Sequence, residues 1–125
     1  MVTSQPRFSP DNFEMTDKIV VLSTCATEED AERLARLLVE KRLAACVNVI
    51  SGVRSHYRWK GAVESAGECL LIVKSSRELF PSLSAALEKA HPYEIPEALA
   101  IAVLDGAANY LNWLGGSLRG EDVST

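Results

Sequence analysis

The sequence has few of the residues that build disulfide frameworks and metal clusters. Its 125 residues include three cysteines and only two histidines. Cys25, Cys46 and Cys69 are odd in number and show no C-x-x-C spacing, which argues against a disulfide framework and against a zinc site. We interpret the three cysteines as reduced thiols, and this predicts a cytoplasmic protein.

A surplus of basic residues and long apolar runs are also missing. The 13 Lys and Arg residues are outnumbered by 17 Asp and Glu residues, which gives a net charge of −4 at pH 7. No basic field is therefore available to attract nucleic acid or anionic lipid. Residues 1–17 hold no apolar run long enough for a signal peptide, and no later run approaches a membrane span. We expect neither a nucleic-acid nor a membrane partner, and a flexible tail over residues 1–17.

The motifs of the common catalytic sites are absent as well. The sequence contains no G-x-S-x-G segment, no phosphate-binding loop and no Cys-His context that would activate a nucleophile. Catalysis needs a nucleophile or a base that a third group holds in place. We therefore predict that the protein is not an enzyme, and a measured turnover abolished by the change His91→Ala would contradict this.

Short apolar and β-branched runs predict four strands. The runs are bounded by polar or turn residues, as strands usually are. The second run is unusually long, because its alternation continues beyond Ser51 and Gly52, where we expect a β-bulge. The predicted strands cover residues 18–25, 44–50 with an extension to residue 60, 68–74 and 98–104.

Apolar residues at helical spacing predict three helices. Thr27 and Asp30 have the spacing of a capping box at the start of the first helix, and the basic pair at 41–42 is placed at its carbonyl end. Pro81 is compatible only with the first turn of the second helix, and Asp105 is the predicted N-cap of the last. The predicted apolar faces are Ala31, Leu34, Ala35 and Leu38 in the first helix, Leu79, Leu83, Ala86, Leu87 and Ala90 in the second, and Tyr110, Trp113, Leu114 and Leu118 in the last.

The order strand, helix, strand, strand, helix, strand predicts an α+β fold of the ferredoxin-like split βαβ class. Four antiparallel strands would carry two helices on one face, with a long hairpin and a C-terminal helix added. The domain would cover residues 18–119, with a short tail at 120–125. The second face of the sheet would then expose Val53, Tyr57, Trp59 and one side of the third strand, so we expect the protein to assemble with copies of itself.

Residues 91–97, which we call the strap, read His-Pro-Tyr-Glu-Ile-Pro-Glu. Each proline fixes its own φ and pushes the preceding residue toward extended conformations. The strap therefore presents an imidazole, a phenol and two carboxylates on a stiff, non-repetitive segment. A rigid display of titratable groups indicates a functional site.

The sequence from about residue 18 to residue 118 resembles the CutA family, the divalent-cation tolerance proteins. The resemblance implies a tight homotrimer whose sheets pair edge to edge, a build similar to PII signalling proteins, copper binding, and a role in heavy-metal tolerance. In animal relatives it implies an association with the anchoring of acetylcholinesterase at membranes. The matching motifs are Ala44-Ala45-Cys46-Val47-Asn48, Ser55-x-Tyr57-x-Trp59-x-Gly61, a glutamate and Lys74 on the return strand, the strap, and Tyr110-x-x-Trp113.

The resemblance also implies a copper(II) site, although no cofactor is expected to be obligatory. His91 matches the family histidine associated with copper, Glu94 is a nearby oxygen donor, and Cys25 can stand in for a missing ligand. Ser23 and Ala90 occupy positions where some family members have a cysteine and a second histidine. The alternative for a buried cysteine is a small apolar filler of the core.

Aromatic and charged residues predict a cleft between subunits for a small ligand, since aromatic walls with a few convergent polar groups are typical of ligand sites. Interface packing is the alternative for Trp59 and Trp113. Two functions stay open: a copper-binding tolerance protein, and a PII-like signalling or scaffolding trimer that binds a small ligand or a partner protein. The predicted cleft residues are Tyr57, Trp59, Lys74, Tyr93, Glu97, Tyr110 and Trp113, and an ion pair of Lys74 with Glu94 or Glu97 is plausible.

Overall fold

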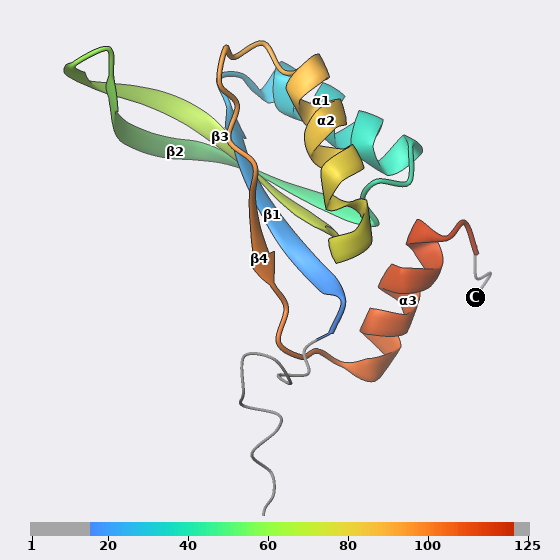
Figure 1. The fold of residues 1–125 in the computed structure, drawn as a ribbon. Helices are drawn as coiled ribbons and strands as arrows, with labels where there is room; N and C mark the ends of the chain where they lie inside the picture. Colours follow the sequence, from blue (N-terminus) through green and yellow to red (C-terminus); the bar gives the residue numbers. More distant parts are fainter. Residues whose placement is uncertain (1–15, 122–125) are drawn as a thin grey trace, which may run out of the picture.

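The computed structural model describes residues 16–121 of the chain (Figure 1). The predicted tails therefore lie almost entirely outside the described residues. The strands are β1 (Lys18–Cys25), β2 (Cys46–Trp59), β3 (Ala62–Ser76) and β4 (Leu99–Ala102). The helices are α1 (Glu28–Glu40), the short 3-10 helix η2 (Arg77–Leu79), α2 (Phe80–Ala90) and α3 (Ala108–Leu118).

The four strands form one antiparallel sheet in the order β2-β3-β1-β4. With α1 and α2 in the two crossovers, this is the predicted split βαβ arrangement. Strand β3 is longer than expected, because it pairs with β2 along the whole arm that extends away from the body in Figure 1. The register of β2 and β3 shifts between Ile50 and Val53, which confirms the bulge at Gly52, and Gly52 has the positive φ of 81° that favours glycine.

Helices α1 and α2 cover one face of the sheet (Figure 1). On this face each strand contributes alternate residues, as the pleat requires, and the residues of β1 and β3 there are fully or almost fully buried. The core is made by Ile19, Val21 and Cys25 of β1, Ala31, Leu34 and Leu38 of α1, Ala44 just before β2, Cys69, Leu71 and Val73 of β3, and Leu83 and Leu87 of α2.

Helix α1 begins as predicted, but it ends earlier than the basic residues at 41–42. The hydroxyl of Thr27 accepts a hydrogen bond from the Asp30 amide at 3.0 Å, which confirms the cap. The helix ends at Glu40 with no basic residue in its last turn. Arg42 has a φ of 57°, and the Leu43 amide donates to the Leu38 carbonyl at 2.9 Å, so a left-handed residue closes the helix.

The prediction that Asp105 caps the last helix is wrong. The first bond of α3 runs from the Leu111 amide to the Ala107 carbonyl at 2.9 Å, which makes Ala107 the N-cap, and no side chain caps it. Asp105 lies too early to reach the helix and instead accepts a hydrogen bond from the neighbouring Gly106 amide at 2.8 Å. The helix itself is confirmed, and it contains all four residues of the predicted apolar face, Tyr110, Trp113, Leu114 and Leu118.

The other face of the sheet carries no helix in the described part of the chain. Residues opposite one another in the register share a face, so Val20, Leu22, Ile72 and their partners in β2 and β4 all lie here. These side chains are half-buried or exposed. Within residues 16–121, none of the helices is long and apolar enough to cross a membrane. The exposed large apolar residues include Ile50 of β2, Tyr57 and Trp59 of the arm, and Leu99 and Ile101 of β4.

Candidate functional site

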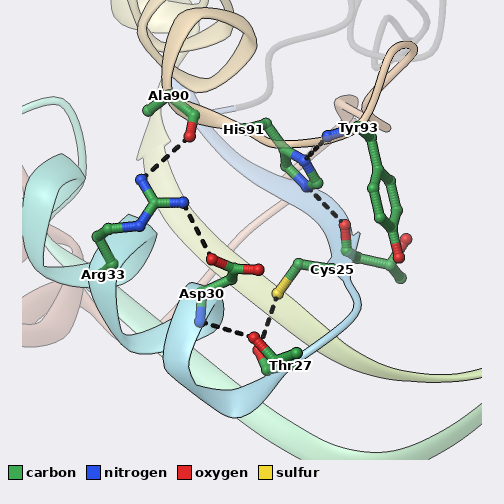
Figure 2. A network of polar contacts seen from close by, with 8 residues as sticks. Cys25, Thr27, Asp30, Arg33, Ala90, His91 and Tyr93 are labelled. Atoms are coloured by element: carbon green, nitrogen blue, oxygen red, sulfur yellow. Dashed lines mark hydrogen bonds and ion pairs between the residues drawn. The ribbon is translucent and has the colours of Figure 1, made fainter.

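The strap begins where α2 ends, and contacts between α2 and α1 fix its starting point. His91 is extended, with φ −81° and ψ 139°, because the following proline disfavours the helical region. The guanidinium of Arg33 donates to the Ala90 carbonyl at 3.0 Å and pairs with Asp30 at 3.2 Å (Figure 2). The end of α2 is thereby tied to the first turn of α1, which fixes where the strap starts.

His91 is buried, with 7% of its surface exposed, and both of its ring nitrogens are hydrogen-bonded (Figure 2). The Tyr93 amide donates to Nδ1 at 3.0 Å, so Nδ1 bears a lone pair. Nε2 lies 2.8 Å from the Thr24 carbonyl oxygen, which can only accept, so Nε2 carries the proton. The imidazole is therefore neutral and joins the strap to the end of β1.

Tyr93 connects the strap to β3. Its hydroxyl donates to Glu68 Oε2 at 2.6 Å, and its ring centroid lies 4.6 Å from that of His91. Burial raises the pKa of the Tyr93 phenol, and the hydrogen bond to the Glu68 carboxylate raises it further. The phenol is thus a fixed donor to a carboxylate, and the two residues hold the strap across the uncovered face of the sheet.

A pocket of about 470 Å³ lies between the strap and the arm. Three of its residues are acidic, three are aromatic, and none is a lysine or an arginine. Burial raises the pKa of Glu97, and the charge of Glu68 adds to this, while a hydrogen bond with Thr24 opposes it. The pocket is lined by Thr24, Ser55, His56, Tyr57, Trp59, Glu68, Tyr93, Glu94, Ile95 and Glu97.

Comparison with known proteins identifies the family of the chain. Residues 19–117 match the family model described as CutA1 divalent ion tolerance protein. The chain belongs to the CutA1 family. It is 46% identical over 95 residues to the divalent-cation tolerance protein CutA of Thermus thermophilus, covering 76% of this chain and 92% of the relative. It is 41% identical over 105 residues to the same-named protein of Pectobacterium atrosepticum, covering 84% and 96% of the two chains.

Solved structures confirm the CutA1 fold. The crystal structure of CutA from Xylella fastidiosa is similar with a TM-score of 0.80 and 37% sequence identity, over 82% of this chain and 99% of that one. The resemblance to the family and the ferredoxin-like fold inferred from the sequence are therefore both confirmed. The relatives are named as tolerance proteins, and these names mention no enzymatic activity.

The CutA1 fold brings some of the predicted site residues together and separates others. Lys74 lies six residues along β3 from Glu68, or about 20 Å, and its ammonium donates to the Asn48 side chain. The ion pair expected between Lys74 and a strap carboxylate is therefore absent from the described protomer. Tyr110 and Trp113 contact each other on α3, with centroids 5.6 Å apart, away from the pocket. The predicted residues that do line the pocket are Tyr57, Trp59, Tyr93, Glu94 and Glu97.

The predicted copper ligands His91 and Cys25 lie behind the pocket rather than in it. Cys25 is fully buried, its Sγ lies 3.5 Å from the Thr27 carbonyl oxygen, and burial, with the neighbouring Cys69, raises its thiol pKa to about 11. A metal ligand must be a thiolate or a free lone pair, and neither His91 nitrogen nor the protonated Cys25 offers one. Among residues 16–121, no group of three His, Cys, Asp or Glu side chains is placed to hold a metal ion.

Several pocket residues were not predicted as site residues. Glu68 and Thr24 are the most important of them, because they bind the strap through Tyr93 and His91. Glu68 was visible as the glutamate on the return strand, in the same motif series as Lys74. Its contact with the strap was not visible, since nothing local links two residues that are 25 positions apart. The others that sequence reasoning missed are Ser55, His56 and Ile95.

Proposed function

We propose that the chain acts in divalent-cation tolerance as a homotrimer and is not an enzyme. The family match over residues 19–117 supports the role, and the uncovered apolar face of the sheet is the observation that supports assembly. Leu99 and Ile101 of β4 are 58% and 50% exposed, on a strand that forms one edge of the sheet within residues 16–121. An exposed apolar edge strand is a template for pairing with another chain, and large exposed apolar patches mark protein–protein interaction sites.

Light scattering tests the assembly, with a variant on each face of the molecule. The wild type is expected at three times 13.6 kDa at micromolar concentration. Ile101→Glu places a charge on the uncovered face and should give a single protomer. The matched control is Val39→Glu, since Val39 is 41% exposed but lies on α1, and it should keep the wild-type mass. A wild type that scatters as one protomer would remove the support for the trimer.

Copper(II) binding at His91, with Glu94 and Cys25 nearby, is the finer form of this proposal and remains a prediction. The arrangement in the protomer does not fit a bound copper ion, because the Nδ1 lone pair faces the Tyr93 amide and Nε2 carries a proton. Copper uptake there therefore requires the imidazole to release one of its two partners.

The cytoplasmic location expected from the reduced thiols also remains a prediction.

A calorimetric copper(II) titration separates this prediction from binding elsewhere. The comparison is the wild type against His91→Gln, whose amide can still donate to the Thr24 carbonyl, and against His56→Ala, which removes an exposed imidazole at the pocket. Loss of the heat with His91→Gln alone would support copper at His91. Loss with His56→Ala alone would place the ion in the pocket and contradict the prediction.

A second candidate function is favoured by the pocket itself. A PII-like trimer would use this space for a small ligand that signals to a partner protein, and a volume of about 470 Å³ is in the usual range for small-molecule sites. Tyr57, Trp59, Tyr93 and Glu97 were predicted as cleft residues and do line one pocket. Saturable binding of a small molecule that protects the indole of Trp59 would support this function.

A further inference from the structure

We propose that the pocket binds a small organic cation of the ammonium class, held by Glu68 and Glu97 and by the aromatic faces of Tyr57 and Trp59. This rests on the second candidate function, in which the pocket is a ligand site, and it names the chemistry of the ligand. Three features of the pocket support this class of ligand. They are its charge, its aromatic walls and the raised pKa of Glu97.

The charge of the pocket selects a cation. Glu68, Glu94 and Glu97 face the space, and no salt bridge from any described residue reaches these carboxylates. The hydrogen-bond partners of Glu68 and Glu97 among the described residues are neutral. Tyr93 donates to Glu68, and Thr24 forms a hydrogen bond with Glu97. Three carboxylates that form no ion pair with a described residue would repel an anionic ligand, and they leave charge uncompensated for a neutral one.

The walls of the pocket favour an organic cation over a metal ion. Within one protomer Tyr57 and Trp59 are 44% and 37% exposed, so no other described part of the chain covers their rings. The ammonium of Lys60 lies 5.8 Å from the Trp59 ring centroid, within the distance at which an aromatic face attracts a cation. The Trp59 ring therefore lies where a cation is attracted, and an ammonium ligand would compete with Lys60 for it. A metal ion would instead need several closely spaced donors, and residues 16–121 provide no group of three.

The raised pKa of Glu97 gives the binding a pH dependence with a definite sign. Burial and the charge of Glu68 favour the protonated form of Glu97 in the empty pocket. A bound cation favours the carboxylate, so binding would lower this pKa, and by linkage the affinity must fall as the pH drops through it. The affinity of a neutral ligand that only contacts the rings would not follow this dependence.

A titration with tetramethylammonium tests the proposal, with tert-butanol as the neutral probe of matched size. The readout is the indole N–H signal of Trp59 in a nitrogen-15 NMR spectrum, and Trp113 on α3 serves as an internal reference. Tetramethylammonium should shift the Trp59 signal saturably, and tert-butanol should not. Equal shifts with both probes, no shift with either, or competition by copper(II) or magnesium(II) at the same site would overturn the proposal.

Two variants and one control identify the residues involved. Glu97→Gln should weaken tetramethylammonium binding about tenfold, and Glu78→Gln, an exposed glutamate on η2, should leave it unchanged. Equal losses in both would mean a non-specific effect of net charge and would contradict the assignment. Should thermal unfolding show that Glu97→Gln is misfolded, Trp59→Leu tests the same site by removing the ring while keeping an apolar side chain.

The mass of each sample by light scattering separates this proposal from the trimer. A trimer that does not bind tetramethylammonium would overturn the ligand class and leave the assembly intact. A single protomer that binds it with the expected Glu97 dependence would overturn the trimer and support the ligand class.

Discussion

The two faces of the sheet have similar apolar residues but very different surroundings. Val21 and Leu71, under the helices, are fully buried, whereas Leu22 and Ile72 on the reverse side are only half-buried. An apolar strand pattern indicates that a face of the sheet is shielded from water. It does not indicate whether the same chain or another copy covers that face. In this molecule the helices account for one face, and the other face also carries the pocket.

The largest expected effect comes from truncating one leucine on each face. Leu71→Ala should cost about 3 kcal/mol of unfolding free energy, as is usual for a fully buried leucine, at every protein concentration. Leu99→Ala on β4 should cost less than about 1 kcal/mol when the protein is dilute, because this residue is 58% exposed in the protomer. Its cost should grow with concentration as the trimer forms. Urea unfolding at two concentrations measures both.

Identical, concentration-independent losses in the two leucine variants would mean that both faces are covered within one chain. A loss for Leu99→Ala that is absent at every concentration would mean that the second face stays open to water. Either result would contradict the view that the helices cover one face and other copies of the chain cover the second.

Alkaline pH should lower the unfolding free energy, because the buried thiol of Cys25 on the covered face resists ionisation. Burial raises the pKa of the Cys25 thiol from its ordinary value of 9.0 to about 11, so the fold favours the neutral thiol. This contribution is fully present below about pH 9 and is lost as the pH rises to about 11, an effect of about 2 kcal/mol. Urea unfolding at pH 8 and pH 10.5 measures it. The Cys25→Ala variant, which cannot titrate there, should lose less stability over the same interval, and a parallel loss would contradict the assignment.

On the uncovered face, the hydrogen bond between Tyr93 and Glu68 is expected to hold the strap. Tyr93→Phe removes a hydroxyl that donates at 2.6 Å to a carboxylate and should cost about 1.5 kcal/mol. Tyr57→Phe is the matched control, since the Tyr57 hydroxyl has no recorded hydrogen bond in the described residues, and it should change the stability by less than about 0.5 kcal/mol. Thermal unfolding of both variants shows whether the strap needs this contact.

Local chemistry made much of the fold predictable from the sequence. The cap at Thr27, the bulge at Gly52 and the position of Pro81 in the first turn of α2 each depend on residues within a few positions. The cap at Asp105 was mispredicted, because the start of α3 is set by the bond from the Leu111 amide to the Ala107 carbonyl. A favourable residue type near a helix start does not fix which turn begins the helix.

The site was only partly predictable, because its key contacts join distant parts of the chain. The strap was recognisable as a display of polar groups, but the contact of His91 with Thr24 spans 67 positions. That contact places the imidazole proton on Nε2 and leaves the only lone pair on Nδ1, where the Tyr93 amide donates to it, and no local pattern indicates the contact with Thr24. Lys74 was assigned to the cleft from its motif, yet its position along β3 takes it away from the pocket. Residue types suggested the chemistry, and the path of the chain decided which of them meet.

The smallest expected effect concerns two buried serines on the covered face. Ser23 and Ser75 are both fully buried, but Ser75 donates to the Leu43 carbonyl at 2.6 Å, whereas the Ser23 hydroxyl has no partner among the described residues. An unpaired buried hydroxyl destabilises a fold, so Ser23→Ala should raise the unfolding free energy by up to about 1 kcal/mol. Ser75→Ala should lower it by about 1 kcal/mol. Chemical unfolding of both variants provides the measurement, and a loss of stability in Ser23→Ala would mean that the Ser23 hydroxyl is hydrogen-bonded in the folded protein, which would contradict this prediction.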